Sequence, residues 1–167
     1  MIRRILSLDP SYEPNNMGYA WFAEEEGKIY LQKWGTAPST VSKGATLLEK
    51  WHDALGSITR LTAGRELIDY VAIEMPQTWG TYRSAMSSSS GVLHNLFFLV
   101  GMIYENMRSQ NFNPVLLTTA EWKGQLPKKV TKERMEKRFG IKLATLHEAD
   151  AVGIGAFFLD QLLKEKK

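Results

Sequence analysis

The amino-acid sequence predicts an α/β fold with a five-stranded mixed sheet, in which three antiparallel strands precede two parallel strands and helices cover both faces. Three observations support this fold class. Tight connections join the first three apolar runs, and segments of helical length separate the later ones. The fourth run is apolar on both faces in its middle, as is typical of an interior strand between helices. A chain of 167 residues can bury a sizeable core, so we expect one domain, 1–167.

The N-terminal part of the chain predicts an antiparallel meander. Its first strand ends at Leu8-Asp9, where Pro10 stops it. The second strand is expected over 18–23 and the third over 28–34, joined by a hairpin turn. Asp is uncommon in buried strands, because an unpaired charge is costly to bury. Asp9 is therefore either a turn-initiating residue or part of a charged site.

The rest of the chain alternates helical and strand patterns. Apolar residues at three- and four-residue steps predict an amphipathic first helix, and Thr131 is the expected N-cap of a short later helix. Gly153 and Gly155 in the last helix would allow it to approach the sheet closely. The expected elements are a helix over 39–60, a strand over 67–74, a helix over 91–107, a strand over 115–118, and helices over 131–139 and 146–164.

Composition excludes several classes of protein. The chain has no cysteine, which excludes disulfides, thiol nucleophiles, zinc–thiolate sites and iron–sulfur clusters, and fits a reducing cytoplasm. The apolar run near the N-terminus is too short for a secretion signal. The longest apolar stretch, 96–103, is far short of the roughly 20 residues that span a bilayer. We therefore expect a soluble, cytoplasmic protein without a membrane partner.

Positive charge is concentrated in one segment. Between Lys123 and Lys142 there are eight basic and two acidic residues, so this segment carries +6 whereas the whole chain carries +3. A basic patch on a faintly acidic body is typical of proteins that bind polyanions. A solvated helix face with internal charge pairs is the alternative.

Four residues form a candidate catalytic cluster. Asp9 and Glu74 each end a predicted strand, and adjacent parallel strands would place these ends side by side. His147 and Asp150 are spaced i, i+3 and share one helix face, whereas Glu148 points elsewhere but is a possible substitute. Three carboxylates and an imidazole suit magnesium or manganese. Two such ions, roughly 3.5–4 Å apart, can activate water and stabilise the leaving oxygen of a phosphodiester.

Each of these residues also has a purely structural interpretation. Glu74 could be a solvated charge at a strand end, and Asp150 could simply favour the first turn of a helix through the helix dipole. Taken together with the separate basic segment, the four residues favour a metal-dependent enzyme that acts on nucleic acid.

The order of the motifs resembles the RuvC family of Holliday-junction resolvases, whose fold is ribonuclease H-like. The resemblance covers nearly the whole chain and is strongest to the small resolvases of phages. The matching motifs are Leu8-Asp9-Pro10 before a glycine-containing strand, Ala72-Ile73-Glu74, Thr119-Ala120-Glu121-Trp122-Lys123-Gly124, a lysine-bearing helix, and His147-Glu148-Ala149-Asp150-Ala151.

The resemblance implies a divalent-metal-dependent endonuclease that cuts four-way DNA junctions by symmetric nicks, leaving 5′-phosphate and 3′-hydroxyl ends. Asp9, Glu74, His147 and Asp150 would hold two magnesium or manganese ions per active site, with Asp9 bridging them. Many members have Asp at the position of His147, and some have His.

The resemblance also implies DNA contacts. Lys123 would lie near the scissile phosphate and neutralise developing charge, and either Lys132 or Lys129 would contact the DNA as well. A lysine bound to backbone phosphates would make affinity fall with salt. The plain alternative for Lys132 is a surface lysine.

The loop after the fourth strand is expected to reach the junction centre. It carries Trp79, Tyr82 and Arg83, and an aromatic side chain stacked on unpaired bases contributes about 1–3 kcal/mol per base. Trp79 is the preferred candidate, although either aromatic could pack on the core instead. The family acts as twofold dimers, which match the symmetry of the junction, so we expect a homodimer. The helix 91–107 is a candidate interface, although it could equally be an ordinary buried helix.

Three competing functions are weaker. A broader ribonuclease H-like nuclease would cut flaps, other branched DNA or RNA-containing duplexes. A junction-binding protein without nuclease activity would have no reason to keep four such residues together. A sugar-kinase or actin-like phosphotransferase shares the strand order, but it needs glycine-rich phosphate loops that are absent after Asp9, and usually a second domain.

Overall fold

The five strands form a mixed sheet in the order β3-β2-β1-β4-β5. The structure is a computed structural model that describes residues 2–64, 68–77 and 91–165. Its strands are β1 (Ile2–Asp9), β2 (Gly18–Glu25), β3 (Lys28–Thr36), β4 (Tyr70–Met75) and β5 (Pro114–Thr118). β2 pairs antiparallel with β1 and β3, whereas β4 pairs parallel with β1 and β5. The predicted α/β class and five-stranded mixed sheet are confirmed.

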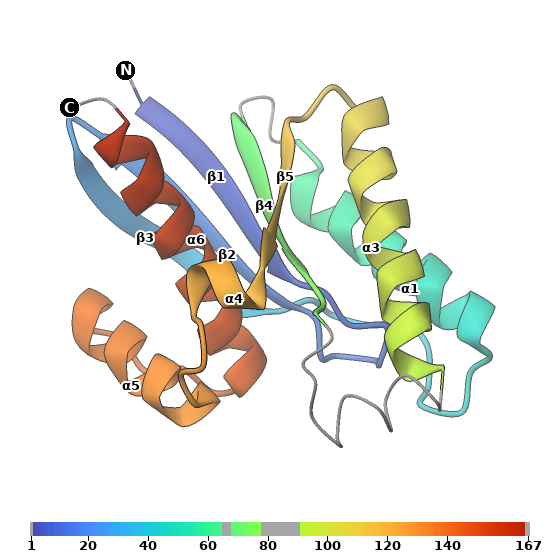
Figure 1. Cartoon of the computed structure of the whole chain (residues 1–167). Coiled ribbons are helices and arrows are strands. Elements are labelled where there is room, and N and C mark those ends of the chain that lie inside the picture. The colour runs from blue at the N-terminus through green and yellow to red at the C-terminus, as the bar shows by residue number, and fades with distance from the viewer. Residues whose placement is uncertain (1, 65–67, 78–90, 166–167) are drawn as a thin grey trace.

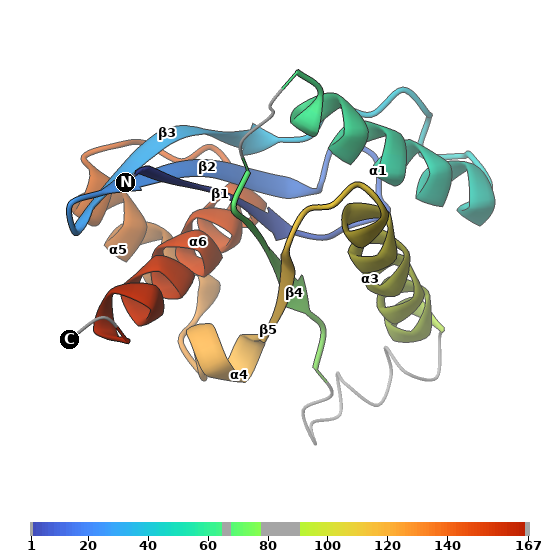
Figure 2. The same cartoon turned by 90° about the horizontal axis from the view of Figure 1, so that it is seen from above.

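Helices cover both faces of the sheet (Figures 1 and 2). One face carries α1 (Leu47–Thr62) and α3 (Val92–Ser109), and the other carries α6 (Leu146–Lys164) with α5 (Lys128–Phe139) and the single turn α4 (Thr119–Trp122). Side chains of β1 alternate between the two layers: Leu6 and Leu8 lie in the core beneath α1 and α3, and Ile5 lies in the core beneath α6. Within the described ranges, no helix is long and apolar enough to cross a bilayer.

The strand register brings the two predicted acidic strand ends together. Leu8 pairs with Ile73 in the parallel β1–β4 ladder, so Asp9 and Glu74, which follow them, are neighbours at the same edge of the sheet. On its other side, Asp9 pairs with Gly18 of β2. The expectation that the first and fourth strands end side by side is therefore correct.

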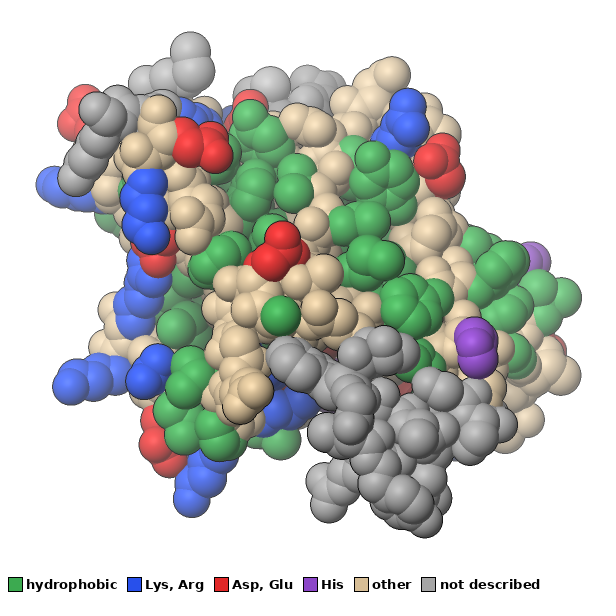
Figure 3. All heavy atoms as spheres, viewed as in Figure 1, with side chains coloured by type: hydrophobic (Ala, Val, Ile, Leu, Met, Phe, Trp, Pro, Cys, Tyr) green, Lys and Arg blue, Asp and Glu red, His purple; other side chains and the backbone are tan. Residues whose placement is uncertain are grey.

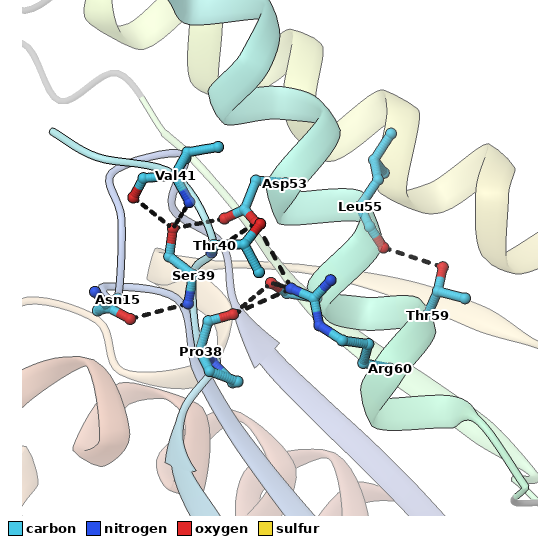
Figure 4. Close-up of polar contacts among 10 residues, drawn as sticks. Asn15, Pro38, Ser39, Thr40, Val41, Asp53, Leu55, Thr59 and Arg60 are labelled. Carbon is cyan, nitrogen blue, oxygen red and sulfur yellow. Dashed lines mark hydrogen bonds and ion pairs between the residues drawn. The ribbon is translucent and has the colours of Figure 1, made fainter. Parts of the chain in front are cut away.

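The first helix begins later than the predicted range 39–60. Its N-cap is Thr46, which forms a capping box, and the residues before it are held by Asp53 (Figure 4). Ser39 Oγ donates to Asp53 Oδ2 at 2.6 Å, and the Thr40 backbone N–H donates to Asp53 Oδ1 at 2.9 Å. Ser and Thr compete with helix formation when their polar groups find such partners, which explains why the apolar periodicity placed the helix start too early.

The boundaries of α5 also differ from the prediction. The helix begins at Lys128 with Pro127 as its N-cap. Thr131 is buried inside the helix, and its backbone N–H donates to the Pro127 carbonyl at 3.1 Å. The predicted N-cap at Thr131 is therefore wrong, because an ordinary helical turn precedes it. The range 146–164 of α6 is confirmed.

Candidate active site at the strand ends

Small residues allow the N-terminal half of α6 to pack directly against the sheet. A Cβ atom on Gly18 would overlap the carbonyl oxygen of His147, and a Cβ atom on Gly155 would overlap the ring of Phe22. The buried Ser7 hydroxyl donates to the Ala151 carbonyl of α6 at 2.7 Å. These contacts fix the height and rotation of α6 over the strand ends. Gly155 thus allows the predicted close approach to the sheet.

His147 and Asp9 form a direct pair across this contact. His147 Nδ1 lies 2.6 Å from Asp9 Oδ2, and the Asp9 side chain is only 8% exposed. The hydrogen bond with Asp9 raises the pKa of His147 above its ordinary value of 6.5, and burial of the ring opposes this effect. His147 is therefore biased toward the imidazolium form, in which it donates to the carboxylate.

Glu74 is held close to the other acids. Burial raises the pKa of Glu74 to about 7, and the negative charge of Asp9, a hydrogen bond with Asp9 and the charge of Asp150 act in the same direction. A hydrogen bond from Thr119 lowers it. Burial and neighbouring negative charge both favour the protonated form of a carboxyl group. The acids therefore converge closely enough to repel one another.

Two lysines engage the fourth predicted residue. Asp150 is fully buried; its Oδ1 lies 2.9 Å from Lys123 Nζ, and its Oδ2 lies 2.8 Å from Lys128 Nζ. Both oxygens of the buried Asp150 carboxylate are therefore in close ion pairs with lysines. The Lys123 side chain is 7% exposed and that of Lys128 is 48% exposed.

Lys128, which was not among the predicted DNA contacts, is the lysine of α5 that contacts Asp150. Burial tends to lower the pKa of Lys128, but its contact with Asp150 outweighs this effect and raises the pKa. Among the described residues, Lys129 and Lys132 form no ion pair. Lys128 is the first residue of α5, and successive helical side chains differ in direction by about 100°, so Lys129 points away from Asp150.

The same residues line an open cleft of about 530 Å³. Its walls come from the ends of β1 and β4, the first turns of α3 and α6, and the α4–α5 segment. The cleft is lined by Asp9, Pro10, Ser11, Tyr12, Glu13, Glu74, Pro76, Gln77, Val92, Leu96, Thr119, Lys123, Lys128 and His147. Three of the four predicted acidic or imidazole residues therefore face a common cleft, together with two lysines. Asp150 lies behind these lysines.

The fit of this site to divalent ions depends on its donor set. Within residues 2–64, 68–77 and 91–165, no group of three or more His, Asp and Glu side chains is arranged so that it could hold a metal ion as it stands. The contacts explain this, since His147 engages Asp9 and two lysines engage Asp150. The oxygen donors still suit magnesium or manganese, and the mutual repulsion of Glu74, Asp9 and Asp150 is what a bound cation would relieve.

Other predicted residues have different outcomes. Trp79, Tyr82 and Arg83 lie outside the described residues. Glu148, which the sequence left open as a ligand, closes the capping box of α6 with Thr145 and accepts the Ala144 backbone N–H at 2.7 Å. Its carboxylate therefore caps the N-terminus of α6.

Sequence reasoning missed the roles of three residues that contact the predicted acids. Thr119 and Trp122 both donate to Glu74, and Lys128 engages Asp150. The Thr-x-x-Glu pattern from Thr118 to Glu121 signalled the turn α4, and Pro127 signalled a helix start before Lys128. The contacts themselves depend on tertiary packing.

The fold of this chain is similar to that of several solved structures. No protein-family model and no curated protein matches this chain. RuvC of Thermus thermophilus in complex with a Holliday junction substrate is 16% identical, covers 96% of each chain, and has a TM-score of 0.69. A second structure of that RuvC covers 98% of each chain with the same identity and TM-score.

A mitochondrial protein from yeast gives a similar result. The Holliday junction resolvase Ydc2 is 16% identical to this chain, with 98% of this chain and 81% of that chain covered and a TM-score of 0.63. At such identities the likeness establishes the fold. The resemblance found in the sequence is thus confirmed at that level: this chain has the RuvC-like form of the ribonuclease H-like fold.

Proposed function

We propose that this protein is a divalent-metal-dependent endonuclease that resolves four-way DNA junctions by paired, symmetric nicks, leaving 5′-phosphate and 3′-hydroxyl ends. The observation that carries the proposal is the convergence of Asp9, Glu74, His147 and Asp150 at one edge of a RuvC-like sheet, beside Lys123 and Lys128. Structural neighbours with this fold include a RuvC bound to a Holliday junction. The sequence resemblance adds a phage or mobile-element origin and action in the host cytoplasm.

The acidic residues would hold two magnesium or manganese ions. When bound, these ions supply a Lewis acid that activates water and stabilises the leaving oxygen. His147 is oriented by Asp9 at 2.6 Å, so it would either ligate an ion or orient the attacking water. Lys123, buried against Asp150, would keep positive charge beside the scissile phosphate.

The basic segment would supply the DNA contacts. Figure 3 shows Lys and Arg side chains gathered on the side of the molecule where α5 and α6 lie. Lys129 is exposed and Lys132 partly exposed on α5, where both can bind backbone phosphates, and the affinity would fall with salt. Trp79, Tyr82 and Arg83 are the proposed contacts to the junction centre.

A second copy of the chain would provide the second nick. Figure 3 shows hydrophobic side chains along α3. On this side Phe98 and Leu48 are 57% and 58% exposed, and the Phe98 ring packs 4.8 Å from that of Trp51. We propose that this face forms the twofold interface, and we expect Phe98→Glu to yield monomers in sedimentation equilibrium.

The decisive experiment compares an end-labelled four-way junction with a matched linear duplex and a flap, with and without magnesium or manganese. Paired metal-dependent nicks near the branch point that spare the duplex are the expected result. Cutting of all branched substrates would instead indicate the broader nuclease, and tight binding without cutting a junction-binding protein.

An Asp9→Asn variant tests the site assignment. It should abolish cutting and leave junction binding in calcium or EDTA nearly unchanged. Loss of folding in this variant would mean that Asp9 is structural.

A further inference from the structure

Two donors from one helical turn converge on a single oxygen of Glu74. Thr119 Oγ1 donates to Glu74 Oε1 at 2.8 Å, and Trp122 Nε1 donates to the same oxygen at 3.1 Å. The two donors are spaced i, i+3 and therefore share a face of the turn α4. Glu74 also lines the cleft together with Asp9, so α4 anchors a residue of the cleft through one of its two carboxylate oxygens.

The turn that carries these donors is fixed to the sheet. Thr118, the last residue of β5, pairs with Met75 of β4, and it caps α4 through a capping box with Glu121. The backbone N–H of Ala120 donates to the Gln77 side chain, just past β4, at 3.0 Å. The position of the turn over Glu74 is thus set by the β4–β5 register and not by a free loop.

The indole of Trp122 has two further contacts with the site. The Lys123 ammonium lies 4.7 Å from the centroid of the indole ring. On α6, a Cβ atom on Gly153 would overlap the ring, and Gly153 lies three residues after Asp150. Gly153 therefore makes room for the ring of Trp122. The sequence had suggested instead that Gly153 allows α6 to approach the sheet. Trp122 thus connects the elements that carry Glu74, Lys123 and Asp150.

We propose that Thr119 and Trp122 are positioning residues that fix one oxygen of Glu74 so that the carboxylate presents the other to a divalent ion. Groups that hydrogen-bond to metal-ligating carboxylates orient them, and their loss typically weakens metal binding 10- to 100-fold. This inference rests on the proposed function only in taking the ion to be magnesium or manganese.

The test measures manganese binding to the full chain without DNA, by isothermal titration calorimetry. Thr119→Val removes the hydroxyl at nearly constant volume, and Trp122→Phe keeps an aromatic ring but removes the N–H donor. Each variant should raise the dissociation constant for manganese roughly 10-fold or more. Thr119→Ser keeps the donor and should stay within about twofold of wild type. Trp34→Phe, on β3 at the far edge of the sheet, controls for loss of an indole.

Three additional measurements separate positioning from general damage. Junction binding in calcium and the melting temperature in EDTA should change little in Thr119→Val, and its cleavage rate should approach the wild-type rate at saturating manganese. Wild-type affinity for manganese in both folded variants would overturn the inference while leaving the proposed nuclease intact. A wild-type protein that cuts junctions without binding manganese or magnesium would overturn both.

Discussion

Replacing Glu74 by Gln should stabilise the ion-free protein at alkaline pH. Burial and the charges of Asp9 and Asp150 raise the pKa of Glu74 to about 7 from its ordinary value of 4.5. The folded state therefore binds this proton more tightly than the unfolded state. Glu74 therefore contributes fully to the free energy of unfolding of the wild-type protein below pH 4.5. This contribution is lost as the pH rises through about 7.

The size of the effect follows from the two pKa values. At about 1.4 kcal/mol for each pH unit, the difference between 4.5 and about 7 corresponds to about 3 kcal/mol. His147, whose pKa is raised by Asp9, also stabilises the fold at low pH and loses this contribution as the pH rises above 6.5 through the folded value. Both proteins share that loss, so it cancels in the comparison.

The assay is urea denaturation in EDTA from pH 4.5 to 8.5. The free energy of unfolding of Glu74→Gln minus that of wild type should increase across this range by up to about 3 kcal/mol. Glu133→Gln, which changes an exposed carboxylate on α5, should show no such trend. A constant difference between Glu74→Gln and wild type, or one that falls as the pH rises, would refute the reasoning.

Four more outcomes follow from the structure. Lys128→Ala should lower the cleavage rate about 100-fold, whereas Lys129→Ala should change the rate less than threefold; equal effects in a junction-cleavage assay would contradict the assignment. Gly18→Ala should destabilise the fold by about 1–3 kcal/mol in thermal or urea unfolding, because its methyl group would overlap the His147 backbone. Gly56→Ala, inside α1, should stabilise it by about 0.5–1 kcal/mol, since its methyl group meets only the flexible end of a side chain. Manganese at 100 times its dissociation constant should raise the free energy of unfolding by about 2.7 kcal/mol, and an unchanged melting curve would argue against a metal site.

The strand ends could be predicted from the sequence because local patterns determine them. A short apolar run that stops at an acidic residue followed by proline places Asp9 at one strand end. The same pattern places Glu74 close to the end of another. Their proximity then follows from the order of strands and helices, and the register of β1 and β4 confirms it. The i, i+3 spacing likewise placed His147 and Asp150 on one face of α6.

The parts that sequence reasoning missed depend on contacts between distant segments. Asp53 holds Ser39 in an extended segment from 14 residues away, which the periodicity of the helix cannot reveal. Lys128 was passed over because its role depends on the residue at which α5 begins. In the sequence, Trp122 looks like an ordinary aromatic residue. Its hydrogen bond to Glu74 forms because the β4–β5 register brings the two residues together.

The unequal burial of the two lysines suggests different tasks for them. Lys123 is 7% exposed and lies between Asp150 and the ring of Trp122, so moving its ammonium would leave the buried carboxylate short of a partner, which is strongly unfavourable. Lys128 is 48% exposed, so its ammonium can turn toward solvent while Lys123 stays on Asp150. Of the two cations, Lys128 is the one that can reach a phosphate in the proposed function, while Lys123 holds the Asp150 carboxylate in place.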